Sequence, residues 1–166
     1  MNLLSIDQIR KKAVNLAKSG SNWHFHILTP ECKLNSKDQF AFVLEDSDSN
    51  TSYVCYSNKP PMDFGAELVK LLVSKDILVE KSKVKSKISA KVQKIKKRAE
   101  ELTKQGKFWH HHMLFPKCMF NKHKGKWIIM FEDQKLKQVI ESVTENEPKS
   151  DLKELEILYY RQKTLR

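Results

Sequence analysis

Residues 23–32 read WHFHILTPEC, and residues 109–118 read WHHHMLFPKC. A glycine precedes each stretch, at Gly20 and Gly106, and an asparagine follows each cysteine, at Asn35 and Asn121. The two copies thus share Gly, Trp, His, His, Pro, Cys and Asn, although Leu or Val would serve a packed core equally well. The retention of these rarer, chemically capable side chains favours a functional site. An internal repeat also predicts that each copy is one supersecondary block.

Each repeat opens with the pattern of an amphipathic helix. Apolar residues recur at intervals of three and four from Ile6 to Leu16 and from Val84 to Leu102, and Gly20 and Gly106 follow where a C-cap glycine belongs. Two alternating runs come next, joined by a polar loop that holds Pro, Cys and Asn, which predicts an antiparallel hairpin. The runs are Asn22–Leu28 and Phe40–Leu44 in the first repeat, and Phe108–Leu114 and Trp127–Phe131 in the second.

The segment after the second hairpin supports two interpretations. Leu136, Val139, Ile140 and Val143 have helical spacing, yet they occupy the place of the strand-like run Thr51–Ser57. An Asn-x-Pro motif follows both segments, so the two occupy equivalent positions in the repeat. We therefore predict a third strand near residues 139–143. A closing helix is then expected in each repeat, N-capped by Asp63 in the first and by Ser150 or Asp151 in the second.

We therefore predict an α+β protein of two tandem αβββα repeats, residues 1–80 and 81–166. Each repeat is a three-stranded antiparallel meander flanked by helices, and we expect the two to be pseudo-twofold related. The order of elements is similar to that of double-stranded-RNA-binding domains. The basic signature that those domains carry at their second helix is missing here, so this is an analogy of fold and implies no membership.

The composition is that of a soluble globular protein, with 40% hydrophobic residues and interspersed charges. Neither an apolar span of transmembrane length nor a signal-peptide core is visible, so we expect no membrane segment and no secretion. Three cysteines, of which only Cys32 and Cys118 are repeat equivalents, make a disulfide framework improbable. We expect a cytoplasmic protein with free or metal-bound thiolates.

The repeated histidines and cysteines are candidate metal ligands. Side chains alternate along a strand, so His24 and His26 share one face, and His111 takes the place of Phe25. A Pro-containing turn would return the cysteine to this face, and imidazole with thiolate favours zinc. Either water or, in the second repeat, His123 would be the fourth ligand. The predicted ligands are His24, His26, Cys32, His110, His112 and Cys118, in two equivalent sites or one shared site.

Two other interpretations of these residues stay open. In the first, the histidines are hydrogen-bonded to carbonyl groups or to Asn35 and Asn121, and the cysteines are small buried hydrophobes. In the second, Cys, His and Asn are nucleophile, base and orienting group of a hydrolase. Cys32 and Cys118 fall in hairpin loops, however, rather than at a helix N-terminus that would lower the thiol pKa. Trp23 and Trp109 face the apolar side and are expected in the core, with Phe40 and Trp127 beside them.

The net charge of +11 is concentrated on residues 81–107, which carry eleven Lys and Arg against two acidic residues. Outside its apolar stripe this helix is lysine-rich, which suits a helix docked on a sheet with its outer face free for phosphates. Structured RNA is the favoured target, and a solvated helix without a partner is the alternative. The candidate contacts are Lys87, Lys91, Lys94, Lys96, Lys97 and Arg98.

Together these features predict a duplicated zinc-binding module that contacts nucleic acid, RNA favoured, through a basic helix. The alternative is a small metal-dependent or thiol-dependent hydrolase that acts on a phosphorylated or nucleotide substrate. The sequence assigns no catalytic residue and no role to Cys55.

Overall fold

The computed structural model describes residues 1–73, 90–134, 136–148, 155 and 159. The chain is a mixed α+β protein that divides into two compact units, Met1–Lys83 and Val84–Arg166. The predicted boundary between residues 80 and 81 lies outside the described residues, and the pseudo-twofold relation stays a prediction. None of the described helices is long and apolar enough to cross a membrane.

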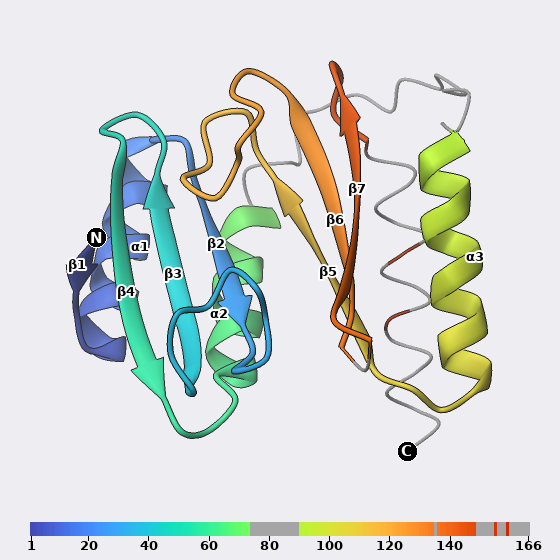
Figure 1. The fold of residues 1–166 in the computed structure, drawn as a ribbon. Helices are drawn as coiled ribbons and strands as arrows, with labels where there is room; N and C mark the ends of the chain where they lie inside the picture. Colours follow the sequence, from blue (N-terminus) through green and yellow to red (C-terminus); the bar gives the residue numbers. More distant parts are fainter. Residues whose placement is uncertain (74–89, 135, 149–154, 156–158, 160–166) are drawn as a thin grey trace. The chain divides into compact units, whose positions relative to one another are not determined.

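The first unit contains a four-stranded sheet with two helices (Figure 1). Strands β2 (Trp23–Leu28), β3 (Phe40–Asp46) and β4 (Thr51–Ser57) form the predicted antiparallel meander. A short strand that sequence analysis missed, β1 (Asn2–Leu3), pairs in parallel with β4, so the prediction of three strands was wrong here. Two residues are too few to show alternation, which is why the pattern held no signal for β1.

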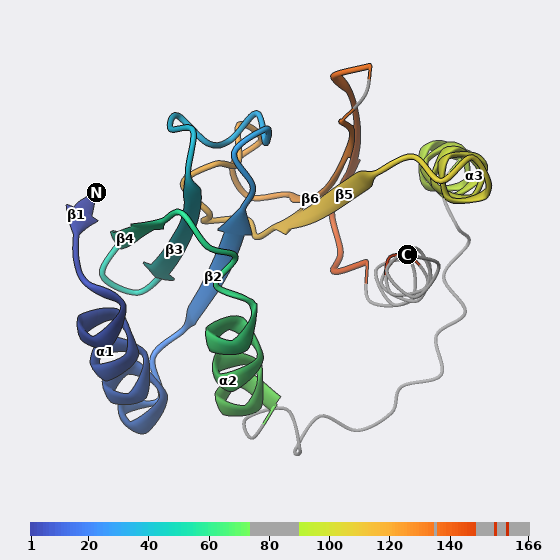
Figure 2. The ribbon, with the colours of Figure 1, turned by 90° about the horizontal axis from the view of Figure 1, so that it is seen from below.

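Helices α1 (Ile6–Ser19) and α2 (Met62–Val73) lie on the same side of this sheet (Figure 2). Helix α1 begins at a capping box, in which Ser5 and Gln8 bond to each other's backbone N–H groups. It ends at Gly20, whose φ of 74° is the left-handed conformation predicted for it. Asp63 lies within the first turn of α2 and is not its N-cap, since the helix already begins at Met62.

The second unit contains a three-stranded meander of β5 (Trp109–Leu114), β6 (Trp127–Asp133) and β7 (Gln138–Thr144). Strand β7 confirms the strand predicted near residues 139–143, where the apolar spacing alone would indicate a helix. Helix α3 (Ala90–Lys104) packs through its predicted apolar stripe. Of the closing helix, the structure describes only Leu155 and Tyr159, and the predicted caps Ser150 and Asp151 lie outside the described residues.

The core of each unit lies between its helices and one face of its sheet. Buried residues of α1 and α2 pack against Trp23, Phe42 and Leu44 in the first unit. The predicted stripe of α3 packs against Trp109, Ile129 and Phe131 in the second. Phe40 and Trp127 are only partly buried and belong to neither core, because each is the first residue of its strand. Both tryptophans of the repeated motif are therefore core residues, as predicted.

Candidate metal centre

Strand alternation separates the core residues of β2 from its histidines. Trp23, Phe25 and Ile27 belong to the core on the helix side of the sheet, so His24 and His26 lie on the opposite face. Both histidines are buried, with exposed fractions of 4% and 5%. The strands β5 and β2 have the same pattern of buried and half-buried residues, and His110 and His112 are buried in the same way.

In the first unit a carboxylate joins the two histidines. Glu45 lies directly opposite His24 in the register of β2 and β3. Its Oε1 is 3.5 Å from His24 Nε2 and 3.6 Å from His26 Nε2. The two imidazole rings are nearly perpendicular, with centroids 5.1 Å apart. All three side chains are buried, and their ligand atoms lie within 4.8 Å of one another, close enough to hold one metal ion.

The second unit places a glutamate beside its first histidine in the same way. Glu132 lies opposite His110 in the register of β5 and β6, and its Oε2 is 3.1 Å from His110 Nε2. The direction between these atoms is not that of a hydrogen bond. The rings of His110 and His112 are 5.0 Å apart at an angle of 76°, and their nitrogens also lie within 4.8 Å of each other. Each unit thus presents two imidazoles and one carboxylate on one face of its sheet.

In each unit a polar side chain outside the candidate ligand set contacts Nδ1 of the first histidine. Ser47 Oγ lies 3.5 Å from His24 Nδ1, and Gln134 Nε2 lies 3.0 Å from His110 Nδ1. An amide group can present either its NH2 or its oxygen at this position. With the oxygen there, His110 Nδ1–H donates to Gln134 and the lone pair of Nε2 is available to a metal, the usual state of a ligating histidine.

Burial keeps His26 neutral. Desolvation, helped by the neighbouring His24 and opposed by Glu45, lowers the pKa of His26 to about 3. Neutral imidazole is the form that binds metals. His111 lies on the opposite face of its strand, beside Trp109 and Tyr159. Burial and the nearby His110 lower the pKa of His111 to about 4.

The structure places the two repeated cysteines in loops. Cys32 and Cys118 are buried in the β2–β3 and β5–β6 loops, and neither forms a disulfide bond. Among the described residues of their own units, neither joins the group of ligand atoms formed by its two histidines. The residues of one unit alone therefore do not form the expected His-His-Cys set, and in the first unit Glu45 joins the group of His24 and His26. His123, the predicted extra ligand, is exposed and lies outside this group.

The repeated asparagines hold these loops in shape. Asn35 Nδ2 donates to the carbonyl groups of Thr29 and Gln39, and its Oδ1 accepts from the N–H of Lys37. Asn121 makes the same three bonds, to Phe115, Lys126 and His123, at 2.7–2.8 Å. Both amide hydrogens are thus used on loop carbonyls and cannot orient a catalytic histidine. This argues against the Cys-His-Asn hydrolase and for a structural role of both asparagines.

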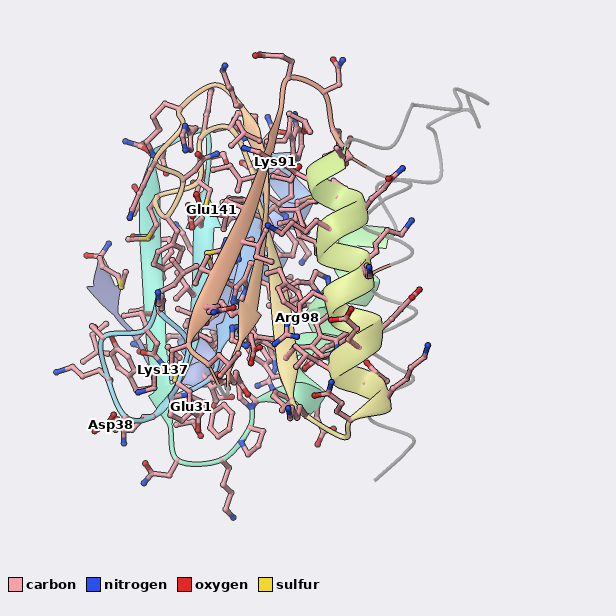
Figure 3. All side chains as sticks on the ribbon, turned by 45° about the vertical axis from the view of Figure 1, so that its right-hand side comes forward. Glu31, Asp38, Lys91, Arg98, Lys137 and Glu141 are labelled. Atoms are coloured by element: carbon pink, nitrogen blue, oxygen red, sulfur yellow. The ribbon has the colours of Figure 1, made fainter. Side chains whose placement is uncertain are left out.

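The described part of the basic helix presents its lysines unevenly. Lys91, Lys94 and Lys97 are exposed and Lys96 is half-buried, while Lys87 lies outside the described residues. Arg98 reaches from α3 towards the strands (Figure 3), and its Nη2 lies 2.8 Å from Oδ2 of the buried Asp133. These carboxylate contacts raise the pKa of Arg98 further. Its ion pair fastens α3 to β6, so Arg98 is placed for packing rather than for phosphate binding.

Sequence analysis missed Glu45 and Glu132 as candidate ligands. Their signal was present, because both second strands end in Glu-Asp, but only the strand register shows that each glutamate faces a histidine. Comparison with known protein families, curated protein sequences and solved structures gives no significant match for this chain. The function must therefore be inferred from the site itself.

Proposed function

We propose that the chain is a duplicated metal-binding module in which each unit holds one zinc ion through two histidines and a glutamate. The distances in the first unit carry this proposal. Ligands about 2.0–2.1 Å from a tetrahedral zinc are separated from each other by about 3.3 Å. The 3.5 and 3.6 Å between Glu45 Oε1 and the two Nε2 atoms are close to this edge length, and they exceed the usual range of a hydrogen bond.

Electrostatics supports the same proposal. A buried carboxylate is costly unless nearby positive charge compensates it. His26 does not supply this charge at neutral pH, because burial holds its pKa at about 3. A divalent cation placed between Glu45 and the two imidazoles would supply it.

The ligand set leaves one coordination position of a tetrahedral ion for a further ligand. Two imidazoles and one carboxylate suit zinc and also other first-row divalent ions, so the preference for zinc no longer draws on thiolate chemistry. Water at the fourth position is the arrangement of a hydrolytic site. The ligand side chains are at most 8% exposed, which favours a structural ion over one that receives a substrate.

Metal analysis of variants tests this assignment. We expect bound zinc in protein purified without chelators, and the loss of one ion per chain in each of Glu45→Gln, His26→Ala and Glu132→Gln. Cys32→Ser tests separately the thiolate ligand that the sequence predicted. Full zinc content in Cys32→Ser supports the His-His-Glu set. A protein that contains no metal and takes up none from added zinc would refute the proposal.

We further propose that the outer face of α3 contacts nucleic acid, RNA being favoured. The supporting observation is that Lys91, Lys94 and Lys97 are exposed while the stripe of Val92, Ile95, Ala99 and Leu102 is buried. Each lost phosphate contact lowers the slope of log affinity against log salt by about 0.7–0.9. We expect a variant with Lys91, Lys94 and Lys97 all replaced by Gln to reduce this slope by about 2. An unchanged slope would make α3 a solvated face only.

A further inference from the structure

The two repeats contain hairpin loops with the same internal frame and different surfaces. In both loops the buried cysteine N–H donates to a carbonyl three residues earlier, at 3.1 Å for Cys32 and 3.0 Å for Cys118. The asparagine bonds described above are also equivalent. The loops thus provide an internal comparison, in which differences at exposed positions are not required by the fold.

The exposed positions differ mainly in charge. Residues 29–39 of the first unit carry two lysines, one glutamate and one aspartate, so this loop is neutral. Figure 3 shows its acidic members, Glu31 and Asp38, on the β2–β3 loop. Residues 115–126 of the second unit carry four lysines and no acidic residue. Lysine replaces Glu31 at Lys117 and Ser36 at Lys122, and both lysines are exposed.

The basic loop is held by its own contacts. Lys124 Nζ donates to the carbonyl of Cys118 at 2.7 Å, and Gly125 has a φ of 83° that other residues adopt with strain. Lys126 pairs with Glu145 at 2.9 Å. Lys117 and Lys122 therefore project from a fixed backbone, which reduces the entropy cost of binding a ligand. Met119 lies between them in the sequence and is 42% exposed.

We propose that the β5–β6 loop, residues 115–126, is a binding surface for single-stranded RNA, with Lys117 and Lys122 contacting phosphates and Met119 contacting unstacked bases. Positive charge that follows the phosphate backbone is one requirement of single-strand binding, and the exposed part of Met119 offers an apolar surface beside it. One exposed Met is too small an apolar area for insertion into a lipid surface, so nucleic acid is the favoured polyanion. The class of partner rests on the proposed function, but the site is separate from the lysines of α3.

The two basic surfaces belong to the same end of the second unit. Helix α3 runs antiparallel to β5, so its first turn, which carries Lys91, lies at the end of the sheet where the β5–β6 loop begins (Figure 1). The first unit offers a charge-matched control on its own helix, because Lys11 and Lys18 of α1 are exposed. Replacing one lysine by glutamate and the other by serine changes the net charge equally at Lys117/Lys122 and at Lys11/Lys18.

The test is a salt titration of full-length protein against fluorescein-labelled oligouridine, followed by fluorescence anisotropy. We expect Lys117→Glu/Lys122→Ser, which installs the residues of the first unit, to lower affinity by about tenfold or more and the salt slope by about 1.4. Lys11→Glu/Lys18→Ser should change affinity by no more than about twofold, because these lysines make no contact in the proposal. Met119→Ala should weaken binding of the single strand and not of an RNA duplex.

The outcomes separate this inference from the proposed role of α3. Equal losses in the loop variant and the Lys11/Lys18 control would show an effect of net charge and overturn the loop site. A loss of affinity in the α3 variant alone would also overturn the loop site. A loss of affinity in the loop variant alone would instead refute the proposed contact of α3 with RNA. Binding of the loop to phosphatidylserine vesicles and not to oligouridine would refute RNA as the partner.

Discussion

A difference between the two buried tryptophans predicts a measurable difference in stability. Trp109 Nε1 donates to Thr103 Oγ1 at 2.9 Å, and the Thr103 hydroxyl in turn donates to the carbonyl of Ala99 at 2.8 Å. The first unit has Ala17 at the position of Thr103, and Trp23 Nε1 is buried there with no hydrogen-bond partner among the residues that the structure describes. Thr103→Val gives the second unit the deficiency that the first already has.

The expected magnitude follows from the burial of the indole. Trp109 is fully buried, so its N–H would lose its partner and gain no water. An orphaned buried donor costs about 1–3 kcal/mol. Val and Thr have nearly the same volume and helix propensity, so neither a cavity nor backbone preference adds to this cost. We expect Thr103→Val to lower the free energy of unfolding of the second unit by about 1–3 kcal/mol.

Urea unfolding followed by tryptophan fluorescence checks this value. In a Trp23→Phe background both remaining tryptophans, Trp109 and Trp127, belong to the second unit, so the signal reports on that unit. Thr103→Ser is the control, because it keeps the hydroxyl. A double-mutant cycle with Trp109→Phe should give a coupling energy of similar size. A Thr103→Val variant as stable as its parent would refute the argument from the buried donor.

Three further substitutions follow from the same structure. His111→Phe should stabilise the chain, and more so in acid: the unfolded state binds a proton below about pH 6.5 and the folded state only below about 4, so the gain grows by about 2 kcal/mol from pH 8 to pH 5. Equal gains in urea unfolding at both pH values would contradict the lowered pKa. Gly65→Ala should raise the melting temperature more in an Ile27→Val background than in the native chain, because its Cβ would lie 2.6 Å from Ile27 Cδ1, an atom that Val lacks, and equal shifts in both backgrounds would contradict this clash. Asn121→Ala should cost about 1–3 kcal/mol through its three loop bonds, and an unchanged unfolding midpoint would show that the loop holds without them.

Several elements were predictable because their signals are local. Gly20 and Gly106 terminate helices through left-handed conformations that other residues adopt with strain. Strand β7 was predictable only through the repeat, since its apolar spacing alone indicates a helix. Strand β1 and the true start of α2 were not predictable, because a two-residue strand and a one-residue shift of a helix end depend on tertiary contacts rather than on pattern.

The sequence by itself determined that two histidines share one strand face in each repeat, because alternation is a property of any β-strand. It also determined that a glycine, a cysteine and an asparagine recur around them. Only the tertiary structure decided which of these groups meet. Pairing of β2 with β3 and of β5 with β6 places Glu45 and Glu132 opposite histidines. Asn35 and Asn121 instead form their hydrogen bonds within the loops. Strand register is a long-range property, set by how whole faces pack, and no local spacing contains it.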